Sequence, residues 1–173
     1  MWERLQRIQK AGAALGTRLS FLAPTLTRMV VGYGFFLTGR GKLNHLDTFA
    51  GLLQDLGIPF PEIQANFVAH LEYYGGIAIL LGVLTRFVAF FLSSTMVVAL
   101  LTADKMAFLQ SWNPGGETVP IEVASFVYLV MLTWLVFHGA GCLSLDGLFG
   151  WLWARRKSAA LPIAPALSLQ GAA

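Results

Sequence analysis

Glu72 is the side chain in this sequence with the clearest capacity for chemistry, because it interrupts a long apolar stretch between residues 66 and 84. An ionised carboxylate held away from water costs several kcal/mol of free energy unless it is paired or hydrogen-bonded. We therefore expect Glu72 to be paired, to be protonated or to face a polar cavity. An ionisable group in such a stretch predicts a functional site.

Lys42 and His70 are the residues that we expect to act with Glu72. A lysine ammonium or an imidazole can donate a hydrogen bond to a ligand oxygen, and a carboxylate can pass a proton. Glu72, Lys42 and His70 are therefore the predicted catalytic residues. His70 and Glu72 lie about 200° apart around a helix axis, so they cannot share one metal ion. The alternative for His70 is an interface residue with no role in binding.

A second set of residues is predicted to bind a cofactor or to shape its site. This set comprises Arg28, Arg40, Tyr73, Gly39 and Gly76. The glycines allow two helices to approach closely, whereas Tyr73 could equally serve packing. The partner of Glu72 stays open between Lys42, Arg40 and Arg28. Helical rise places Arg28 roughly 10 Å from Glu72 along the bundle, a separation that a long arginine side chain can partly close.

Helices typical of a membrane protein must position these side chains. The chain is 56% hydrophobic and 12% charged, whereas soluble domains average about 25% charged residues. Four apolar stretches have the length that a helix needs to cross a bilayer, which is roughly 20 residues with a range of about 17–25. They are residues 21–38, 66–84, 87–103 and 121–138. We predict an all-α fold, a four-helix transmembrane bundle over residues 19–153.

Three flanking segments complete the predicted organisation. Residues 1–18 place Trp2, Leu5 and Ile8 on one helical face, which indicates an amphipathic segment lying in the headgroup plane. Residues 47–57 carry apolar side chains at helical spacing and predict a short interfacial helix in the first external loop. Residues 154–173 are expected to form a flexible tail.

The placement of basic residues predicts orientation and partners. The two ends of the chain and the turn at Arg86 hold more lysine and arginine than the opposite loops, so both termini are expected in the cytoplasm. This clustering favours a lipid bilayer over nucleic acid as partner. With that topology, polar residues from several segments would converge at the outer mouth of the bundle. They are Arg40, Lys42, His45, His70, Glu72, Asp104, Lys105 and Glu122.

Cysteine and histidine usage limits the possible metal chemistry. The chain has one cysteine, Cys142, and three histidines. No cysteine pair exists for a disulfide, an iron–sulfur cluster or a zinc site. No second histidine is expected at the depth of His138 to complete a bis-histidine haem site. We therefore expect neither a metal ion nor haem.

At these positions the chain resembles the DoxX family of small four-span bacterial membrane proteins, over nearly all of residues 21–146. The resemblance rests on five short motifs. No single motif is specific to the family, but their order and spacing taken together are specific. The motifs are Arg28-x-x-x-Gly32-x-x-Phe35-Phe36-x-x-Gly39-x-x-Lys42, Leu56-Gly-Ile-Pro59, Glu72-x-x-Gly75-Gly76, Leu80-x-Gly82-x-x-Thr85-Arg86 and Gly139-Ala-Gly-x-Leu-Ser-Leu-Asp146.

The resemblance implies a multi-pass protein of the bacterial inner membrane that is linked to oxidoreductase systems. Within that group, the membrane subunit of thiosulfate:quinone oxidoreductase has the best-defined activity. Arg28, Lys42 and Glu72 would be the charged positions that match the family. Since no metal centre is expected in the chain itself, electrons would pass through a bound quinone or a partner subunit.

Two hypotheses about function follow. The chain is a quinone-linked oxidoreductase subunit with quinone as its cofactor and an ionisable site at the outer mouth of the bundle. Alternatively, it is a non-catalytic membrane anchor, scaffold or assembly subunit for a partner complex. Either hypothesis expects a partner subunit or a second copy of the chain. A solute or proton pathway is a weaker third hypothesis, because four spans without repeat symmetry do not favour a transporter.

Overall fold

The computed structural model describes residues 2, 4, 6, 9, 10, 20–113, 115, 119–141 and 144–159, with the backbone alone at residues 154 and 157–159. These residues contain helices and turns but no strand, so the prediction of an all-α fold is confirmed for this part of the chain. In chain order the helices are α2 (Leu22–Asn44), α3 (Leu46–Asp55), α4 (Pro61–Leu81), α5 (Thr85–Leu101), α6 (Lys105–Gln110), the 3-10 helix η1 (Pro120–Glu122), α7 (Ala124–His138) and α8 (Leu145–Ala159).

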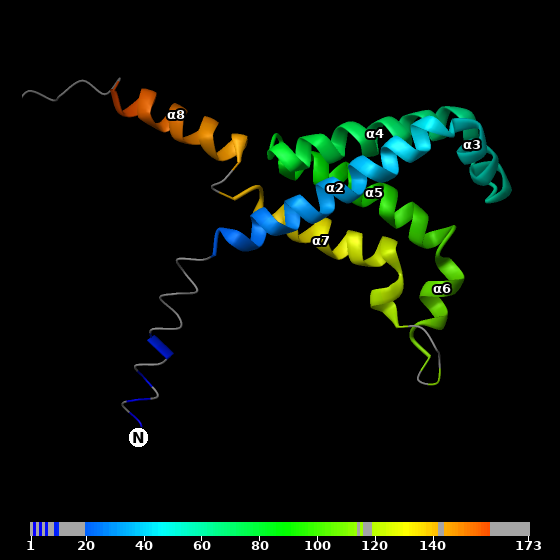
Figure 1. Ribbon diagram of the computed structural model, residues 1–173, viewed down its shortest axis with the longest axis horizontal. Helices are drawn as coiled ribbons and strands as arrows, with labels where there is room; N and C mark the ends of the chain where they lie inside the picture. Colours follow the sequence, from blue (N-terminus) through cyan, green and yellow to red (C-terminus); the bar gives the residue numbers. More distant parts are fainter. Residues whose placement is uncertain are drawn as a thin grey trace, which may run out of the picture.

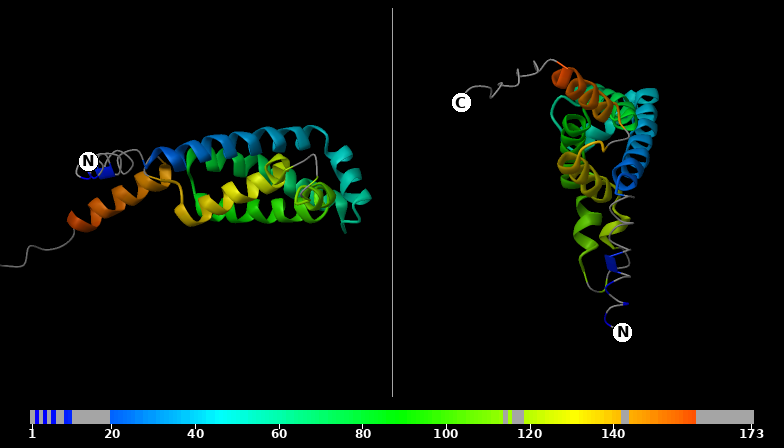
Figure 2. Two further views of the ribbon diagram at one scale, coloured as in Figure 1. Left: turned by 90° about the horizontal axis from the view of Figure 1, so that it is seen from below. Right: turned by 90° about the vertical axis from the view of Figure 1, so that its left-hand side faces the viewer.

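Four of these helices, α2, α4, α5 and α7, form an elongated bundle (Figure 1). α2 packs along α4, α4 contacts α5, α5 packs along α7, and α7 returns to α2. α3 lies at one end of the bundle against α4, whereas α8 extends away from the opposite end (Figures 1 and 2). The bundle therefore has two separate ends that are joined by a common core.

The bundle helices cover the four predicted segments, with shifted ends. α2 continues past Thr38 to Asn44, because arginine and lysine are good helix formers and do not interrupt it. α4 begins at Pro61 rather than at residue 66, since proline fits the first helical turn, where its missing N–H is not needed. α4 ends before Gly82, whose φ of 70° is the left-handed conformation that favours glycine at a helix C-terminus.

Two glycines allow α2 and α4 to approach each other closely. A Cβ atom added to Gly39 would collide with the backbone nitrogen of Tyr73, and one added to Gly76 would collide with the backbone nitrogen of Phe36. Backbone-to-backbone packing of this kind requires small residues. These two contacts fix an antiparallel register that places the last turns of α2 beside the middle of α4.

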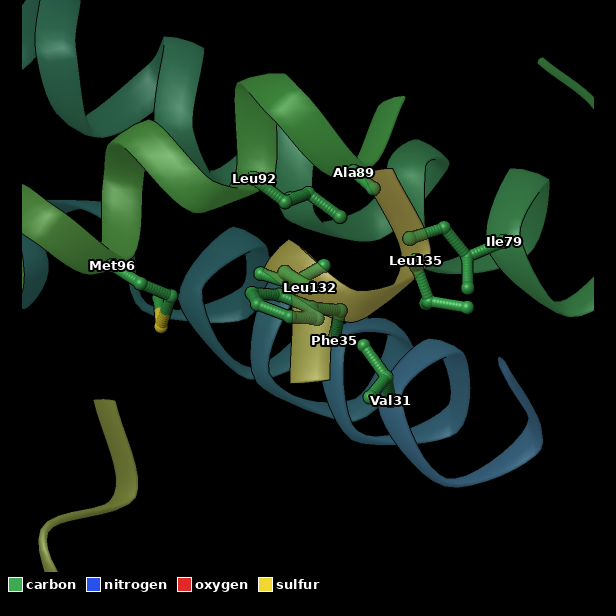
Figure 3. Packing of buried hydrophobic residues seen from close by; sticks show 8 residues of the cluster. All are labelled: Val31, Phe35, Ile79, Ala89, Leu92, Met96, Leu132 and Leu135. Carbon is green, nitrogen blue, oxygen red and sulfur yellow. The ribbon is translucent and has the colours of Figure 1, made fainter. Parts of the chain in front are cut away.

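Apolar side chains from all four helices fill the centre of the bundle (Figure 3). Full burial of one such side chain contributes about 1.5–3 kcal/mol to stability, so this cluster holds α5 and α7 against the α2–α4 pair. Its buried members are Val31, Phe35, Ile79, Ala89, Leu92, Met96, Leu132 and Leu135.

The end of the bundle near α8 is closed by hydrogen bonds between two turns. Asp146 accepts hydrogen bonds from the backbone N–H groups of Leu84 at 2.8 Å and Thr85 at 3.0 Å, which satisfies donors at the N-terminus of α5. Its own N–H donates to the carbonyl oxygen of Gly82 at 2.9 Å, just past the end of α4. We call the group of Gly82, Leu84, Thr85 and Asp146 the Asp146 clasp.

The prediction that the four helices span a membrane is not confirmed. Among the residues that the structure describes, no helix is both long enough and apolar enough to cross a bilayer. α5 and α7 contain 17 and 15 residues, against the roughly 20 that the hydrocarbon core requires. α2 and α4 are longer, but charged side chains interrupt them, among them Arg28, Lys42 and Glu72.

The flanking segments are described only in part. The helix expected over residues 47–57 corresponds to α3, which Gly57 follows with a left-handed φ of 72°. The tail expected over residues 154–173 is helical as far as Ala159, and its remaining residues lie outside the described ranges. Leu5, Ile8 and most of the amphipathic segment expected over residues 1–18 also lie outside them, as does Cys142.

Candidate functional site

Lys42 and Glu72 form an ion pair at the end of the bundle next to α3. Lys42 Nζ lies 2.6 Å from Glu72 Oε1 and donates a hydrogen bond to it. The Glu72 side chain is 1% exposed, whereas that of Lys42 is 28% exposed. The carboxylate is therefore the buried member of the pair, and the lysine connects it to the surface.

The packing of α2 on α4 explains why these two residues meet. Gly39 lies against the backbone at Glu72 and Tyr73, so Lys42, about one turn later on α2, extends over the same part of α4. Arg28 is 14 residues before Lys42, which is about 21 Å along a helix. The choice between the predicted partners of Glu72 is thereby resolved in favour of Lys42.

Only one oxygen of the Glu72 carboxylate is used by this pair. Oε2 is buried and accepts no hydrogen bond from any residue that the structure describes. A carboxylate has acceptor capacity for several hydrogen bonds, and leaving a buried charged acceptor unsatisfied is costly. Glu72 thus retains a free acceptor position inside the protein.

A cavity of about 390 Å³ lies next to the pair, between α3, α4 and α5. Lys42 and Glu72 are among the residues that line it, and most of the remaining wall is aliphatic or aromatic. We call this space the Lys42–Glu72 pocket. Its apolar lining includes Phe49, Leu52, Leu53, Phe67, Met96 and Ala99. An apolar cavity with a few convergent polar groups is the usual form of a small-molecule site.

α3 covers the pocket and places an aromatic ring over the lysine. The Nζ atom of Lys42 lies 4.7 Å from the ring centroid of Phe49, a distance suited to a cation–π interaction. Leu53, one turn after Phe49, is buried beneath the same helix. The amphipathic character of α3 therefore serves the pocket, and the sequence prediction that it lies against an outer membrane face did not anticipate this.

His70 does not join the Lys42–Glu72 pair. Its side chain is exposed, its Nδ1 atom lies 2.8 Å from the carbonyl oxygen of Asn66 on the same helix, and its ring stacks on Tyr74 at 6.1 Å. His70 is also absent from the lining of the Lys42–Glu72 pocket. The structure therefore separates His70 from the two residues with which it was predicted to act.

The residues predicted to bind a cofactor lie around the pocket or far from it, and none of them lines it. Gly39 and Gly76 form the crossing of α2 and α4. Tyr73 packs its ring against Phe36, with 5.3 Å between ring centroids. Arg40 is exposed. These residues position the pair or flank it, and their place in the structure gives them no direct contact with the pocket.

Arg28 belongs to the opposite end of the bundle. Its side chain is 2% exposed and lies against Gly82 and Ser144, and its charge interacts favourably with that of Asp146. Arg28 therefore supports the Asp146 clasp. Arg86 adds a further link at this end, since its Nη2 donates a hydrogen bond to the carbonyl oxygen of Phe137 at 3.3 Å.

Two of the other polar residues expected at the outer mouth, Asp104 and Glu122, accept hydrogen bonds that serve the local structure. Asp104 accepts a hydrogen bond from the Ser125 hydroxyl at 2.6 Å, which ties the turn after α5 to α7. Glu122 accepts one from the backbone N–H of Val119 at 3.2 Å. His45 and Lys105 are exposed. Of the expected cluster, only Lys42 and Glu72 form a charged pair within the described residues.

Sequence reasoning missed the part that α3 and α5 play in the site. Phe49, Leu52, Leu53 and Leu56 recur at helical spacing, and this pattern could have suggested a cover over Lys42 rather than a membrane contact. The α5 residues that line the pocket are mostly apolar or small, and such residues carry no chemical signature in a sequence. Among the residues that the structure describes, no group of three His, Cys, Asp or Glu side chains could hold a metal ion.

The fold and the site define a small helical-bundle protein with a buried ion pair beside an apolar pocket. The DoxX family model matches residues 23–105, a range that includes both Lys42 and Glu72. The chain is also similar to a Bacillus subtilis (strain 168) protein named "Putative oxidoreductase CatD". The two are 30% identical over 125 residues, which are 70% of this chain and 82% of that protein. The chain belongs to the DoxX family. No solved structure matches it.

Proposed function

We propose that this protein is a membrane-located subunit of a redox system and that it binds a quinone in the Lys42–Glu72 pocket. The observation that carries the proposal is the ion pair of Lys42 and Glu72 beside a largely apolar cavity of about 390 Å³. A quinone combines an apolar ring with polar oxygens, so it matches such a lining. Membership of the DoxX family and the similarity to a protein named as an oxidoreductase support the link to redox chemistry.

In this proposal the two charged residues have different roles. Reduction of a quinone to a quinol takes up two electrons and two protons. Lys42 donates a hydrogen bond to a quinone oxygen and stabilises the negative charge that develops on it. Glu72 carries one of the two protons to or from that oxygen, and the other ring oxygen exchanges its proton with water. The electrons come from a partner subunit that has its own redox centre.

The proposed membrane location rests on the apolar surface of the bundle. Large hydrophobic side chains are exposed on each of the four bundle helices, for example Met29 of α2, Phe67 of α4, Phe90 of α5 and Phe137 of α7. Extended exposed apolar surface marks contact with a membrane or a protein. We propose an inner-membrane protein with both termini in the cytoplasm. Labelling of Cys142 with a membrane-impermeant thiol reagent tests this orientation. We expect labelling in inverted vesicles, and labelling only in right-side-out vesicles would contradict the orientation.

A non-catalytic anchor or scaffold is the second candidate function. It is favoured by the fact that the ion pair connects α2 to α4, so that the charges could serve only to hold the helices together. This reading predicts that neutralising Glu72 lowers stability without altering any ligand affinity or turnover. Copurification of a stable redox partner is compatible with both candidates and does not separate them.

The test of the proposed function compares the wild-type protein with Glu72→Gln and with the control Glu62→Gln. Glu62 lies in the first turn of α4 on the exposed surface, so its variant makes the same chemical change outside the pocket. Quinone affinity is measured by titration of the full-length protein in lipid nanodiscs, and stability is measured by thermal unfolding. We expect Glu72→Gln to change quinone affinity and quinone-coupled turnover, and Glu62→Gln to change neither.

The same measurements separate the two candidates. A Glu72→Gln protein that loses thermal stability but keeps the wild-type quinone affinity supports the scaffold. A wild-type protein that binds no quinone under any of these conditions rejects the proposed function altogether.

A further inference from the structure

One oxygen of the Glu72 carboxylate, Oε2, is a buried acceptor that the ion pair with Lys42 does not use. Glu72 is 1% exposed and lines the pocket, its Oε1 is held by Lys42 Nζ at 2.6 Å, and its Oε2 accepts no hydrogen bond from the described residues. A buried carboxylate oxygen without a donor is unfavourable. A ligand that supplies a hydrogen-bond donor at this position removes that cost.

The oxidised and reduced forms of a quinone differ in this respect. A quinone oxygen is a carbonyl oxygen, which can only accept hydrogen bonds, whereas a quinol oxygen carries a hydroxyl, which both donates and accepts. Either form can accept a hydrogen bond from Lys42. Only the hydroxyl form can also donate to Glu72 Oε2, and a carbonyl placed there would direct its lone pairs at a carboxylate.

We infer that the Lys42–Glu72 pocket selects a ring that carries a hydroxyl, so that it binds the reduced quinol, or a phenol, more tightly than the quinone. This inference rests on the proposed function, because it specifies the form of the ligand in the same pocket. The hydroxyl donates to Glu72 Oε2 and accepts from Lys42 Nζ, so one group of the ligand satisfies both charged residues.

The other polar side chains of the pocket bond to the backbone. Gln64 Nε2 donates to the carbonyl oxygen of Pro59 at 2.8 Å. The hydroxyls of Ser94, Thr95 and Thr102, all on α5 or at its end, donate to backbone carbonyl oxygens one turn earlier, at 2.6–2.8 Å. The protons of these three hydroxyls are therefore already used in hydrogen bonds to the backbone. Glu72 is the lining residue that combines a charge, burial and an acceptor without a donor, so we assign to it the discrimination between a hydroxyl and a carbonyl.

The first experiment measures the affinity of the full-length wild-type protein in lipid nanodiscs for duroquinol and for duroquinone under anaerobic conditions. Hydrogen bonds to charged groups correspond to about a tenfold to hundredfold change in affinity, and we expect duroquinol to bind more tightly by at least about tenfold. A second ligand pair, 4-methoxyphenol and 1,4-dimethoxybenzene, differs by one hydroxyl and is not interconverted by oxidation. We expect the phenol to bind more tightly by a similar factor.

The second experiment repeats both titrations with Glu72→Gln. The amide oxygen of the glutamine faces the Lys42 donor, so its NH2 group takes the position of Oε2 and becomes a donor. We expect the preference for duroquinol to disappear or to reverse in favour of duroquinone. Glu62→Gln, the exposed control on the same helix, should keep the wild-type preference.

The outcomes distinguish this inference from the proposed function. Equal affinities for both redox forms in the wild-type protein, or tighter binding of duroquinone, overturn the inference and leave quinone binding intact. Binding of neither form rejects the proposed function as well. If Glu72→Gln does not fold, the phenol and its methyl ether still decide the question on the wild-type protein. An unchanged preference in a folded Glu72→Gln protein also overturns the inference.

Discussion

The two ends of the bundle each contain a buried charged residue, and they differ in what surrounds it. At the Asp146 clasp, both oxygens of the Asp146 carboxylate accept backbone hydrogen bonds, and buried Arg28 lies beside the clasp. At the Lys42–Glu72 pocket, one carboxylate oxygen is paired and the other accepts nothing from the described residues. Both carboxylate oxygens of the clasp thus have donors within the protein, whereas Oε2 of Glu72 at the pocket has none among the described residues.

The packing around Arg28 and Glu72 differs as well, although each end of the bundle has a cavity: Leu84, Thr85 and Asp146 line one of about 420 Å³ at the clasp. Arg28 at the clasp is packed so closely that a Cβ atom on Gly82 would collide with its guanidinium group. Glu72 lies instead beside a cavity of about 390 Å³. Natural proteins satisfy almost all buried polar groups. A buried carboxylate oxygen without a donor is costlier to leave unsatisfied than a neutral hydroxyl such as that of Thr85 at the clasp. We therefore assign stability to the clasp, whose carboxylate accepts hydrogen bonds at both oxygens, and ligand binding to the pocket, whose carboxylate does not.

The largest expected effect comes from breaking the ion pair at its exposed member. Lys42→Met leaves the Glu72 carboxylate buried without a partner, and removal of one partner of a buried pair costs about 3–5 kcal/mol of stability. Unfolding by denaturant in detergent micelles measures this loss. The double variant Lys42→Met/Glu72→Gln should recover part of it, because no charge then remains buried.

The control for this prediction is Lys105→Met, which removes an exposed lysine at the start of α6. We expect it to change the free energy of unfolding by no more than about 0.5 kcal/mol. If Lys42→Met is as mild as this control, Glu72 is not the buried charge that the structure indicates. The contrast between pocket and clasp would then lose its basis.

A smaller effect is expected from the clasp. Asp146→Ala removes two acceptors for N–H groups at the start of α5, and we expect a loss of about 2–4 kcal/mol of stability. Thermal unfolding measures this loss, and titration with duroquinol on the same sample measures binding. Asp146→Asn keeps one acceptor oxygen and should lose less. An Asp146→Ala protein that unfolds at the wild-type temperature, or that folds but loses its affinity for duroquinol, would contradict the division of roles.

The sequence predicted the helices and the buried carboxylate because both depend on local composition. A charged residue in an apolar stretch is visible without a structure, and so are segments of about helix length bounded by glycine and proline. The sequence also favoured Lys42 over Arg28 as the partner of Glu72, because the helical rise already separated Arg28 from Glu72 along the bundle. The helical rise does not determine the register of α2 on α4, because this register depends on the contacts of Gly39 and Gly76.

The rest of the site depends on contacts between segments that are distant in the sequence. Asp146 bonds to Leu84 and Thr85, about 60 residues earlier, and nothing near Asp146 indicates those partners. The pocket likewise requires α3 to fold over Lys42 and α5 to supply an apolar wall. His70 was predicted in the site because it lies close to Glu72 in sequence, but two residues along a helix place it on a different face.

The smallest expected effect concerns the glycines that set the register of α2 on α4. Gly39→Ala adds a methyl group where the backbone of Tyr73 already lies, and overpacking of this kind costs about 1–3 kcal/mol. Gly41→Ala is a matched control on the same helix, because no atom lies within 4 Å of the added Cβ. Alanine is the better helix former by about 0.5–1 kcal/mol, so Gly41→Ala should raise the unfolding temperature. Because Gly39 also places Lys42 over Glu72, Gly39→Ala should weaken duroquinol binding while Gly41→Ala leaves it unchanged. Equal effects of the two alanines on stability and on affinity would mean that the pocket does not depend on this helix crossing.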